Sequence, residues 1–156
     1  MAVYFQSENK FELNDDEKNA RAQWVISAIE ASGNNCGELT YIFCSDDFLL
    51  DINQRYLQHD TFTDIITFDY SQDDLISGDI FISTERVREN AAAFEVDFKH
   101  ELARVMIHGV LHLLGFDDHS EEDKKKMRAE EDRLISTLIG WAALFKPCTR
   151  LEIFLL

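Results

Sequence analysis

The sequence predicts a single α+β domain in which helices pack on a small mixed β-sheet. The chain has 156 residues, which fits one domain, and 46% of them are hydrophobic, enough to bury a core. Short β-branched and aromatic segments alternate with longer segments of helical periodicity. Because no internal repeat or linker interrupts this pattern, residues 1–139 are expected to form the domain.

Four segments are typical of strands. Residues 1–7 alternate loosely and predict an edge strand, and Glu38–Cys44 places its large apolar side chains on one side. Thr63–Tyr70 is rich in β-branched and aromatic residues. We expect it to pair with Gly78–Ser83 through the Asp-rich loop between them.

Capping residues and apolar spacing predict five helices. Asn14 with Glu17 resembles a capping box and opens the first helix, which Gly33 ends. Ser45 caps a second helix that runs to about Gln58. The remaining helices are expected over Thr84–Phe94, Asp97–Leu114 and Ser120–Ile139. Residues 140–156 then form an apolar C-terminal extension: a docked strand, an oligomer contact or an added tail, among which the sequence does not choose.

Composition excludes several classes of protein. The net charge of −15 repels phosphate backbones and disfavours a general nucleic-acid-coating protein, although a local basic cleft stays compatible with it. No apolar run reaches the about 20 residues of a membrane span, and the first residues lack the order of a secretory signal. We therefore expect a cytoplasmic protein without a membrane partner. Cys36, Cys44 and Cys148 are odd in number and far apart, so reduced thiols are expected.

The segment Val105–His119 (VMIHGVLHLLGFDDH) is typical of a metal site. His108 and His112 are the only polar side chains between Val105 and Phe116, and their i, i+4 spacing stacks them on one face of a buried helix. Unpaired imidazoles there would cost about 1–3 kcal/mol each. A divalent metal satisfies both at once. The alternative is a pair of core histidines satisfied by protein groups.

A third histidine would complete the site. Gly115 can end the helix in the left-handed conformation and turn the chain, so that His119 returns toward the first two rings. Three histidines leave one tetrahedral position for water, which is the arrangement of a catalytic zinc site with one Zn²⁺ per chain. The segment is similar to the long zinc-protease signature, but Gly109 replaces its glutamate, which disfavours a peptidase.

The sequence HGVLHLLGFDDH resembles the signature of the YbeY family of bacterial rRNA maturation factors, regarded as metal-dependent endoribonucleases. Asn53 and Tyr56, then Thr63–Phe68, then Gly78-Asp79 resemble the family's central blocks in the same order, and the resemblance covers about residues 35–139. It implies a zinc ion on three histidines and a single α+β domain. It also implies a role in ribosome maturation, with ribosomal RNA and the small ribosomal subunit as partners and no DNA expected.

Two positions depart from the family pattern. Six residues separate His112 from His119, one more than the family motif usually has, so Asp117 or Asp118 is an alternative third ligand. Leu57 occupies the place of a family arginine implicated in activity, which leaves Arg55 as the nearby cation.

Other candidate residues have two interpretations each. Asp117 and Asp118 are the carboxylates nearest to the histidines for catalysis, although no residue stands out as general base. Asp64 either orients a ligand histidine or caps its strand. Four basic residues lie close together in the sequence: Arg86, Arg88, Lys99 and Arg104. They either line an RNA groove or form salt bridges with Glu85, Glu89 and Glu101.

Three functions remain open. The first is a zinc-dependent endoribonuclease of rRNA maturation that uses a zinc-bound water. The second is a non-catalytic ribosome-associated zinc-binding factor, and the third is a metal hydrolase with another substrate. Loss of metal and of cleavage in His112→Ala would favour the first.

Overall fold

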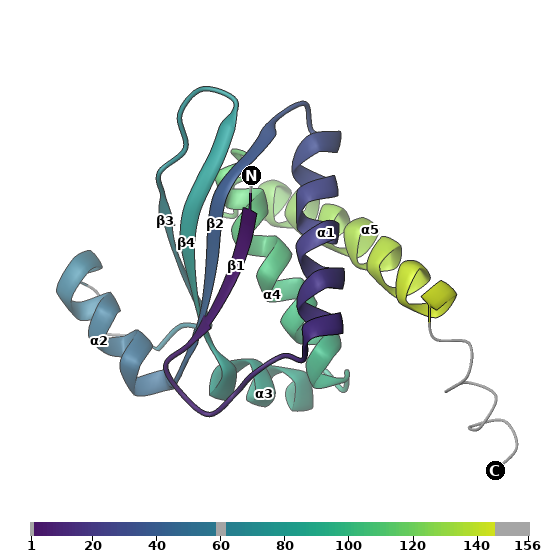
Figure 1. The fold of residues 1–156 in the computed structure, drawn as a ribbon. Helices are drawn as coiled ribbons and strands as arrows, with labels where there is room; N and C mark the ends of the chain where they lie inside the picture. The colour runs from purple at the N-terminus through teal and green to yellow at the C-terminus, as the bar shows by residue number, and fades with distance from the viewer. Residues whose placement is uncertain (1, 59–61, 146–156) are drawn as a thin grey trace, which may run out of the picture.

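The computed structural model describes residues 2–58 and 62–145, with the last part, 139–145, described by its backbone alone. Four strands form one sheet in the order β1-β2-β4-β3 (Figure 1). β1 and β4 both pair with β2 in parallel, whereas β3 pairs with β4 antiparallel, which confirms the predicted mixed sheet and the predicted pairing of the third and fourth strands. The strands are β1 (Ala2–Ser7), β2 (Asn35–Cys44), β3 (Ile65–Asp69) and β4 (Leu75–Ser83).

Among the described residues, five helices accompany the sheet, at the predicted places in the chain. They are α1 (Asp15–Ala31), α2 (Asp46–Leu57), α3 (Thr84–Ala93), α4 (Phe98–Leu113) and α5 (Glu121–Phe145). Side-chain caps explain where they begin: Asn14 accepts a hydrogen bond from the backbone of Glu17 at 2.8 Å, and Ser45 accepts one from Phe48 at 3.1 Å. The predicted α+β fold class is confirmed.

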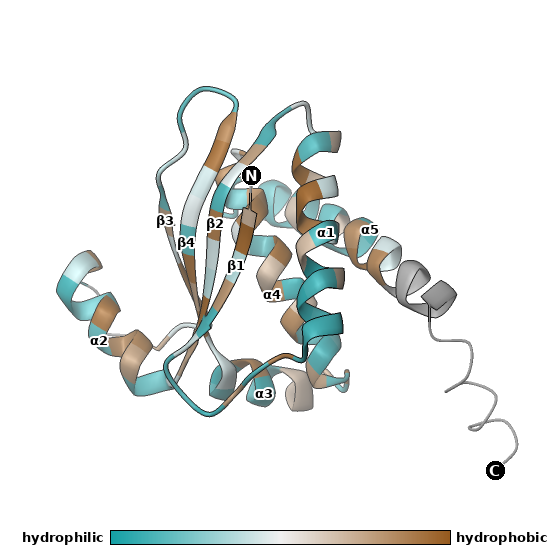
Figure 2. Cartoon of the chain, in the orientation of Figure 1, coloured by the Kyte–Doolittle hydropathy of each residue, from teal (hydrophilic) through white to brown (hydrophobic). Residues whose placement is uncertain are grey.

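The core lies between the sheet and the layer formed by α1, α4 and α5 (Figure 1). Hydrophobic residues recur along the strands and along α1 and α4, which face one another there (Figure 2). Tyr41 in the middle of β2 is fully buried, and its hydroxyl donates to the carbonyl oxygen of Met106 in α4 at 3.0 Å. This bond satisfies the only polar atom of a large apolar side chain. It fixes α4 against the centre of the sheet.

Gly109 lets α4 approach the sheet closely. A Cβ at this position would lie 3.0 Å from the Ile65 Cδ1 atom and 3.1 Å from two carbon atoms of Ile80. These strand side chains therefore occupy the space that the absent side chain leaves. His108 precedes Gly109 directly, and His112 follows it one turn after His108. Both side chains are half-buried at the edge of the core.

Element boundaries differ modestly from the predicted ones. β2 and β4 begin earlier than expected because their first residues pair with each other, with Asn35 opposite Leu75. α5 continues past the predicted end at Ile139 to Phe145, so the first residues of the predicted extension are helical. The rest of it, 146–156, falls outside the described residues, as does Cys148. Cys36 and Cys44 are buried free thiols, and no helix of the described part of the chain is long and apolar enough to cross a membrane.

Candidate metal centre

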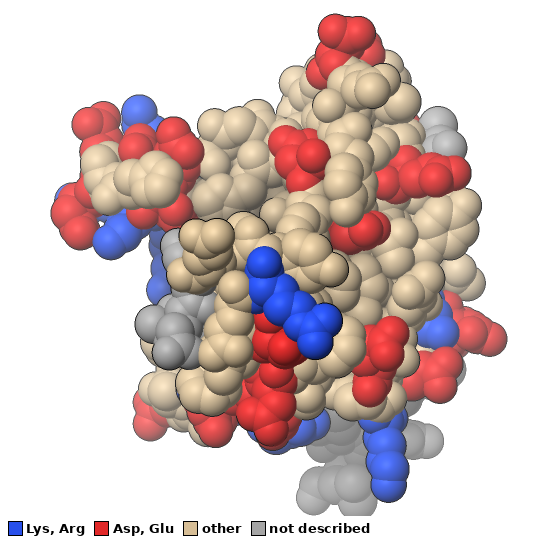
Figure 3. All heavy atoms as spheres, turned by 90° about the vertical axis from the view of Figure 1, so that its left-hand side faces the viewer, with Lys and Arg blue, Asp and Glu red and all other residues tan. Residues whose placement is uncertain are grey.

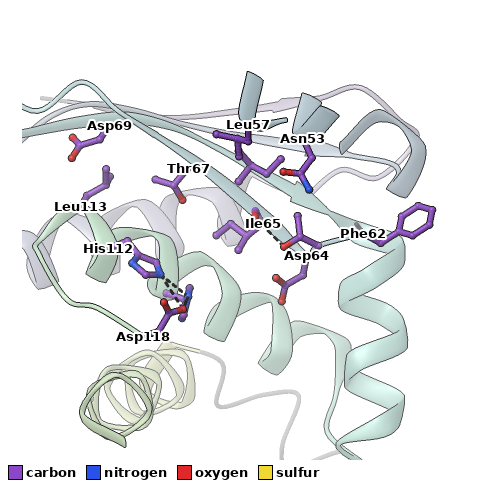
Figure 4. Close-up of a pocket in the computed structure, with 13 residues that line it drawn as sticks. Asn53, Leu57, Phe62, Asp64, Ile65, Thr67, Asp69, His112, Leu113 and Asp118 are labelled. Carbon is purple, nitrogen blue, oxygen red and sulfur yellow. Dashed lines mark hydrogen bonds and ion pairs between the residues drawn. The ribbon is translucent and has the colours of Figure 1, made fainter. Parts of the chain in front are cut away.

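Three side chains converge where α4 ends. The Nε2 atoms of His108 and His112 lie 3.0 Å apart, and the Oδ2 atom of Asp118 lies 3.5 Å from the first and 3.4 Å from the second. All three side chains are half-buried, and their ligand atoms lie within 4.8 Å of one another. Figure 4 shows His112 and Asp118 pointing toward one another. One atom of each residue can therefore contact a shared ion.

The spacing of these atoms fits a divalent metal. Bonds of about 2.0–2.1 Å in a tetrahedral site imply about 3.3–3.4 Å between neighbouring ligand atoms, close to the three separations observed. Two imidazole nitrogens and one carboxylate oxygen are a ligand set that zinc accepts. Three protein ligands leave a further position open, which is typical of catalytic rather than structural sites.

Local structure explains how Asp118 reaches the histidines. α4 stacks His108 and His112 one turn apart, with ring centroids 4.6 Å apart. Gly115 then adopts a positive φ of 97°, and the backbone N–H of Phe116 donates to the carbonyl oxygen of Leu111 at 2.9 Å. This turn folds the following residues back along the helix end, as predicted.

Each histidine ring is oriented by a second contact. The Nδ1 atom of His108 lies 2.7 Å from Oε2 of Glu131, and the Nδ1 atom of His112 lies 3.1 Å from the carbonyl oxygen of Phe116. An acceptor at Nδ1 places the ring proton there and leaves the lone pair of Nε2 free for a metal. Both rings can therefore offer Nε2 to a metal.

Glu131 contacts the cluster and was not predicted from the sequence. It comes from the middle of α5, is only 4% exposed, and also accepts a hydrogen bond from Arg104 at 3.0 Å. Burial lowers the pKa of His108, but the hydrogen bond and charge of Glu131, with the charges of Asp118 and Asp64, outweigh burial and raise that pKa above its ordinary value. The only sequence signal was a carboxylate on the apolar side of the last helix.

His119 is not brought to the cluster. Its side chain is 87% exposed, and its Nε2 atom lies 4.0 Å from Asp117, itself an exposed residue. The additional residue after Phe116 places Asp118, and not His119, at the end of the turn. The predicted three-histidine set is thus replaced in the geometry by two histidines and Asp118, the alternative left open by the spacing.

The cluster opens into a pocket of about 610 Å³ between α4, β3 and the end of α2. Asn53 and Leu57 contribute from α2, and Phe62 and Asp64 from the segment before β3 (Figure 4). Among the described residues that line the pocket there is no Lys or Arg. The remaining lining residues are Thr63, Ile65, Ile66, Thr67, Asp69 and Leu113, with the three cluster residues.

The predicted cation near the site, Arg55, does not line this pocket. Its side chain is 70% exposed and pairs with Asp51 at 3.2 Å on the same helix. Leu57, which stands in place of the family arginine, does line the pocket and is 44% exposed. The pocket wall therefore presents the apolar side chain of Leu57 at the position of the family arginine.

The basic residues of the predicted RNA groove are largely neutralised by neighbouring carboxylates. Arg86 pairs with Asp46 at 2.9 Å and with Glu89 at 2.7 Å. Figure 3 views the molecule from the left-hand side of Figure 1. It shows Asp and Glu spread over that face, with Lys and Arg scattered among them. Of the two interpretations, the structure favours salt bridges. The other pairs are Lys99–Glu17, Arg104–Glu101, Arg104–Glu131 and Arg104–Asp132, and Arg88 lies over the ring of Phe98.

Asp64 lies on the pocket wall opposite the turn after α4. Its carboxylate points from just before β3 toward α4 (Figure 4), and the Asn90 amide donates a hydrogen bond of 3.5 Å to it. Burial raises its pKa, against the opposing charge of His108. Asp64 does not orient either ring through Nδ1, because the Nδ1 atom of His108 contacts Glu131 and that of His112 contacts the carbonyl oxygen of Phe116.

The fold and this cluster define a class: α+β proteins with a metal-ready pocket at the end of a buried helix. A family model described as endoribonuclease YbeY matches residues 4–139. A Flavobacterium psychrophilum protein named endoribonuclease YbeY is 53% identical over 130 residues, covering 83% of this chain and 91% of that protein. A protein of the same name from Flavobacterium johnsoniae is 47% identical over 134 residues, covering 86% and 95%.

The chain therefore belongs to the endoribonuclease YbeY family, and the resemblance stated from its motifs is confirmed. The solution structure of TM1509 from Thermotoga maritima has the same fold. It superposes with a TM-score of 0.66 at 24% identity, over 92% of this chain and 93% of that one.

Proposed function

We propose that this protein is a metal-dependent endoribonuclease that binds one zinc ion through His108, His112 and Asp118. The observation that carries the proposal is the convergence of their three ligand atoms within 3.5 Å of one another, in an open pocket. Membership of a family whose relatives are named endoribonucleases supplies the reaction type.

The pocket residues divide the work. A bound divalent ion supplies a Lewis acid for a phosphate oxygen and lowers the pKa of a water molecule. Glu131 of α5 holds the His108 ring in place, and its ion pair with Arg104 joins α5 to α4 beside the site. The pocket is open to solvent on one side, which would admit a chain substrate.

The substrate we propose is ribosomal RNA in the small ribosomal subunit, in the cytoplasm. An exposed pocket mouth with the apolar side chains of Leu57 and Phe62 suits unpaired nucleotides, whose bases can contact apolar and aromatic groups. The strongly acidic surface opposes unspecific attraction of nucleic acid. Recognition is therefore expected to depend on the local contacts of a ribosomal site.

The ligand set is tested by two neighbouring substitutions. Asp118→Ala removes a proposed ligand, whereas His119→Ala removes the adjacent exposed imidazole and serves as the matched control. Elemental analysis after dialysis should find one zinc per chain in the wild type and in His119→Ala, and less than a tenth of that in Asp118→Ala. Zinc retained by Asp118→Ala and lost from His119→Ala would overturn this ligand set.

Activity is tested with the same proteins. Zinc-loaded wild type should cut single-stranded RNA from the small subunit, a chelator should abolish cleavage, and added zinc should restore it. His112→Ala should be inactive in every condition. Cleavage that persists in His112→Ala after chelation would show that the cut does not depend on this centre.

A second candidate is a non-catalytic ribosome-associated factor that keeps zinc for structure. One observation favours it: Leu57 lines the pocket where the family arginine is absent, and Arg55 points to Asp51 instead. This candidate predicts full zinc occupancy and binding to the small subunit, with no RNA cut on any ribosomal substrate.

A further inference from the structure

We propose that Asp64 is the general acid of the reaction, which protonates the ribose oxygen that leaves phosphorus. This inference rests on the proposed nuclease function and assigns a residue to a step that the metal cluster does not perform. A metal ion held by His108, His112 and Asp118 would supply its chemistry on the attacking side. The departing alkoxide still needs a proton, because it is strongly basic.

The pocket offers few groups for that step. Among its described lining residues, the groups outside the cluster that can carry a proton are the carboxyls of Asp64 and Asp69. Asp69 lies at the far end of β3, is exposed, and accepts a hydrogen bond from the backbone of Ser71 at 2.9 Å. Asp64 is the carboxyl that is half-buried in the wall.

The main chain around Asp64 is fixed. Its carbonyl oxygen accepts a hydrogen bond from the backbone N–H of Ser83 at 3.0 Å, which joins the start of β3 to the end of β4. Ser83 is itself the N-cap of α3, and Asn90 on that helix approaches the Asp64 carboxylate. A general acid needs such a supported position, because proton transfer requires a defined distance to the leaving atom.

The charges that face Asp64 come from three helices. Arg86 lies on α3, His108 and Glu101 on α4, and Glu131 on α5. Burial is the largest contribution and raises the pKa of Asp64, and the charge of Glu131 adds to it. The charges of His108 and Arg86 and a hydrogen bond from the backbone of Asp64 itself lower this pKa without cancelling the rise. A carboxyl with a raised pKa holds its proton nearer to neutral pH, as an acid catalyst must.

The step balances as follows. The oxygen of one water molecule forms a bond to phosphorus while the bond from phosphorus to the leaving ribose oxygen breaks. The electron pair of the broken bond stays on the ribose oxygen, which takes the proton of the Asp64 carboxyl. The attacking water releases a proton to solvent, and Asp64 recovers one from solvent. One phosphodiester and one water thus become a phosphate monoester and a ribose hydroxyl.

A substrate with a better leaving group tests this role. Asp64→Asn keeps the shape of the side chain but removes the transferable proton, and Asp79→Asn on β4, outside the pocket, is the matched control. The substrates are one RNA oligonucleotide and its analogue in which sulfur replaces the leaving ribose oxygen, as identified from the wild-type products. Sulfur departs as a thiolate and needs no proton.

Asp64→Asn should reduce kcat/KM on the RNA by about 10²–10⁴-fold. It should cut the sulfur analogue within about tenfold of the wild-type rate, whereas Asp79→Asn should cut both substrates normally. Zinc content and the thermal midpoint of Asp64→Asn should match the wild type, which separates proton transfer from metal binding and folding.

Each contrary result has a distinct meaning. Equal losses on both substrates, or loss of zinc from Asp64→Asn, would overturn the general-acid role. So would unchanged cleavage of RNA. Failure of the zinc-loaded wild type to cut any RNA or its sulfur analogue would instead contradict the proposed function, and with it the inference that rests on it.

Discussion

The two walls of the pocket are built in different ways. The ligand wall consists of α4 and the turn to Asp118, and its geometry follows from one continuous segment: an i, i+4 pair, a glycine turn and a carboxylate. The opposite wall, with Asn53, Leu57, Phe62 and Asp64, is assembled from the end of α2 and the start of β3. From the proposed function we expect the ligand wall to bind the metal and the opposite wall to select the substrate.

The largest expected effect is on the ligand wall. Replacement of His108 or His112 by Ala removes one of three ligand atoms, so we expect bound zinc to fall by at least tenfold and RNA cleavage to vanish. Isothermal titration of the metal-free proteins with zinc measures this directly. An unchanged affinity in both variants would mean that the metal, if bound, lies elsewhere.

The next largest effect concerns the support behind this wall. Glu131→Gln weakens the contact that orients His108, and such changes typically reduce metal affinity about 10–100-fold. Asp132→Asn, which alters the exposed neighbour that shares Arg104, is the control and should change affinity less than threefold. Equal effects of the two substitutions would show that Arg104, and not the contact to His108, matters.

The opposite wall should respond to an added cation without a change in metal binding. Leu57→Arg places a positive charge at the pocket mouth, so we expect kcat/KM on RNA to rise about fivefold at low salt. Leu57→Met keeps the wall neutral and should leave the rate near that of the wild type. A gain that persists at high salt, or a change in zinc affinity, would contradict this division between the walls.

The smallest effect is expected on stability, at the contact of α4 with the sheet behind the pocket. Gly109→Ala gains helix propensity but forces a methyl group against Ile65 and Ile80, so we expect a net loss of about 1 kcal/mol in the free energy of unfolding. Ile65→Val removes the closest carbon atom and should recover part of this loss in the double variant. Urea denaturation of the metal-free proteins gives both values, and strictly additive losses would argue against the contact.

The same contrast explains what the sequence could predict. Apolar periodicity and caps at Asn14 and Ser45 predicted the elements and the mixed sheet, because these signals are local. The helix histidines were found for the same reason. Glu131 was missed because it reaches His108 across 23 residues of sequence, through the packing of α5 on α4.

The choice between Asp118 and His119 illustrates a finer limit. The spacing showed that the turn after His112 differs from the family pattern, but a shift of one residue decides which side chain ends beside the rings and which points to solvent. The backbone after Gly115 brings Asp118, and not His119, beside the rings. The pairing of Arg86 with Asp46, 40 residues away, was equally invisible to local patterns.

The most direct test of the metal centre is X-ray absorption spectroscopy at the zinc edge of the protein loaded with one equivalent of zinc. Imidazole rings produce characteristic scattering from their outer carbon and nitrogen atoms, which allows the bound rings to be counted. We predict two imidazoles, with oxygen atoms completing the coordination. Three imidazoles would contradict the assignment of Asp118 and return His119 to the metal.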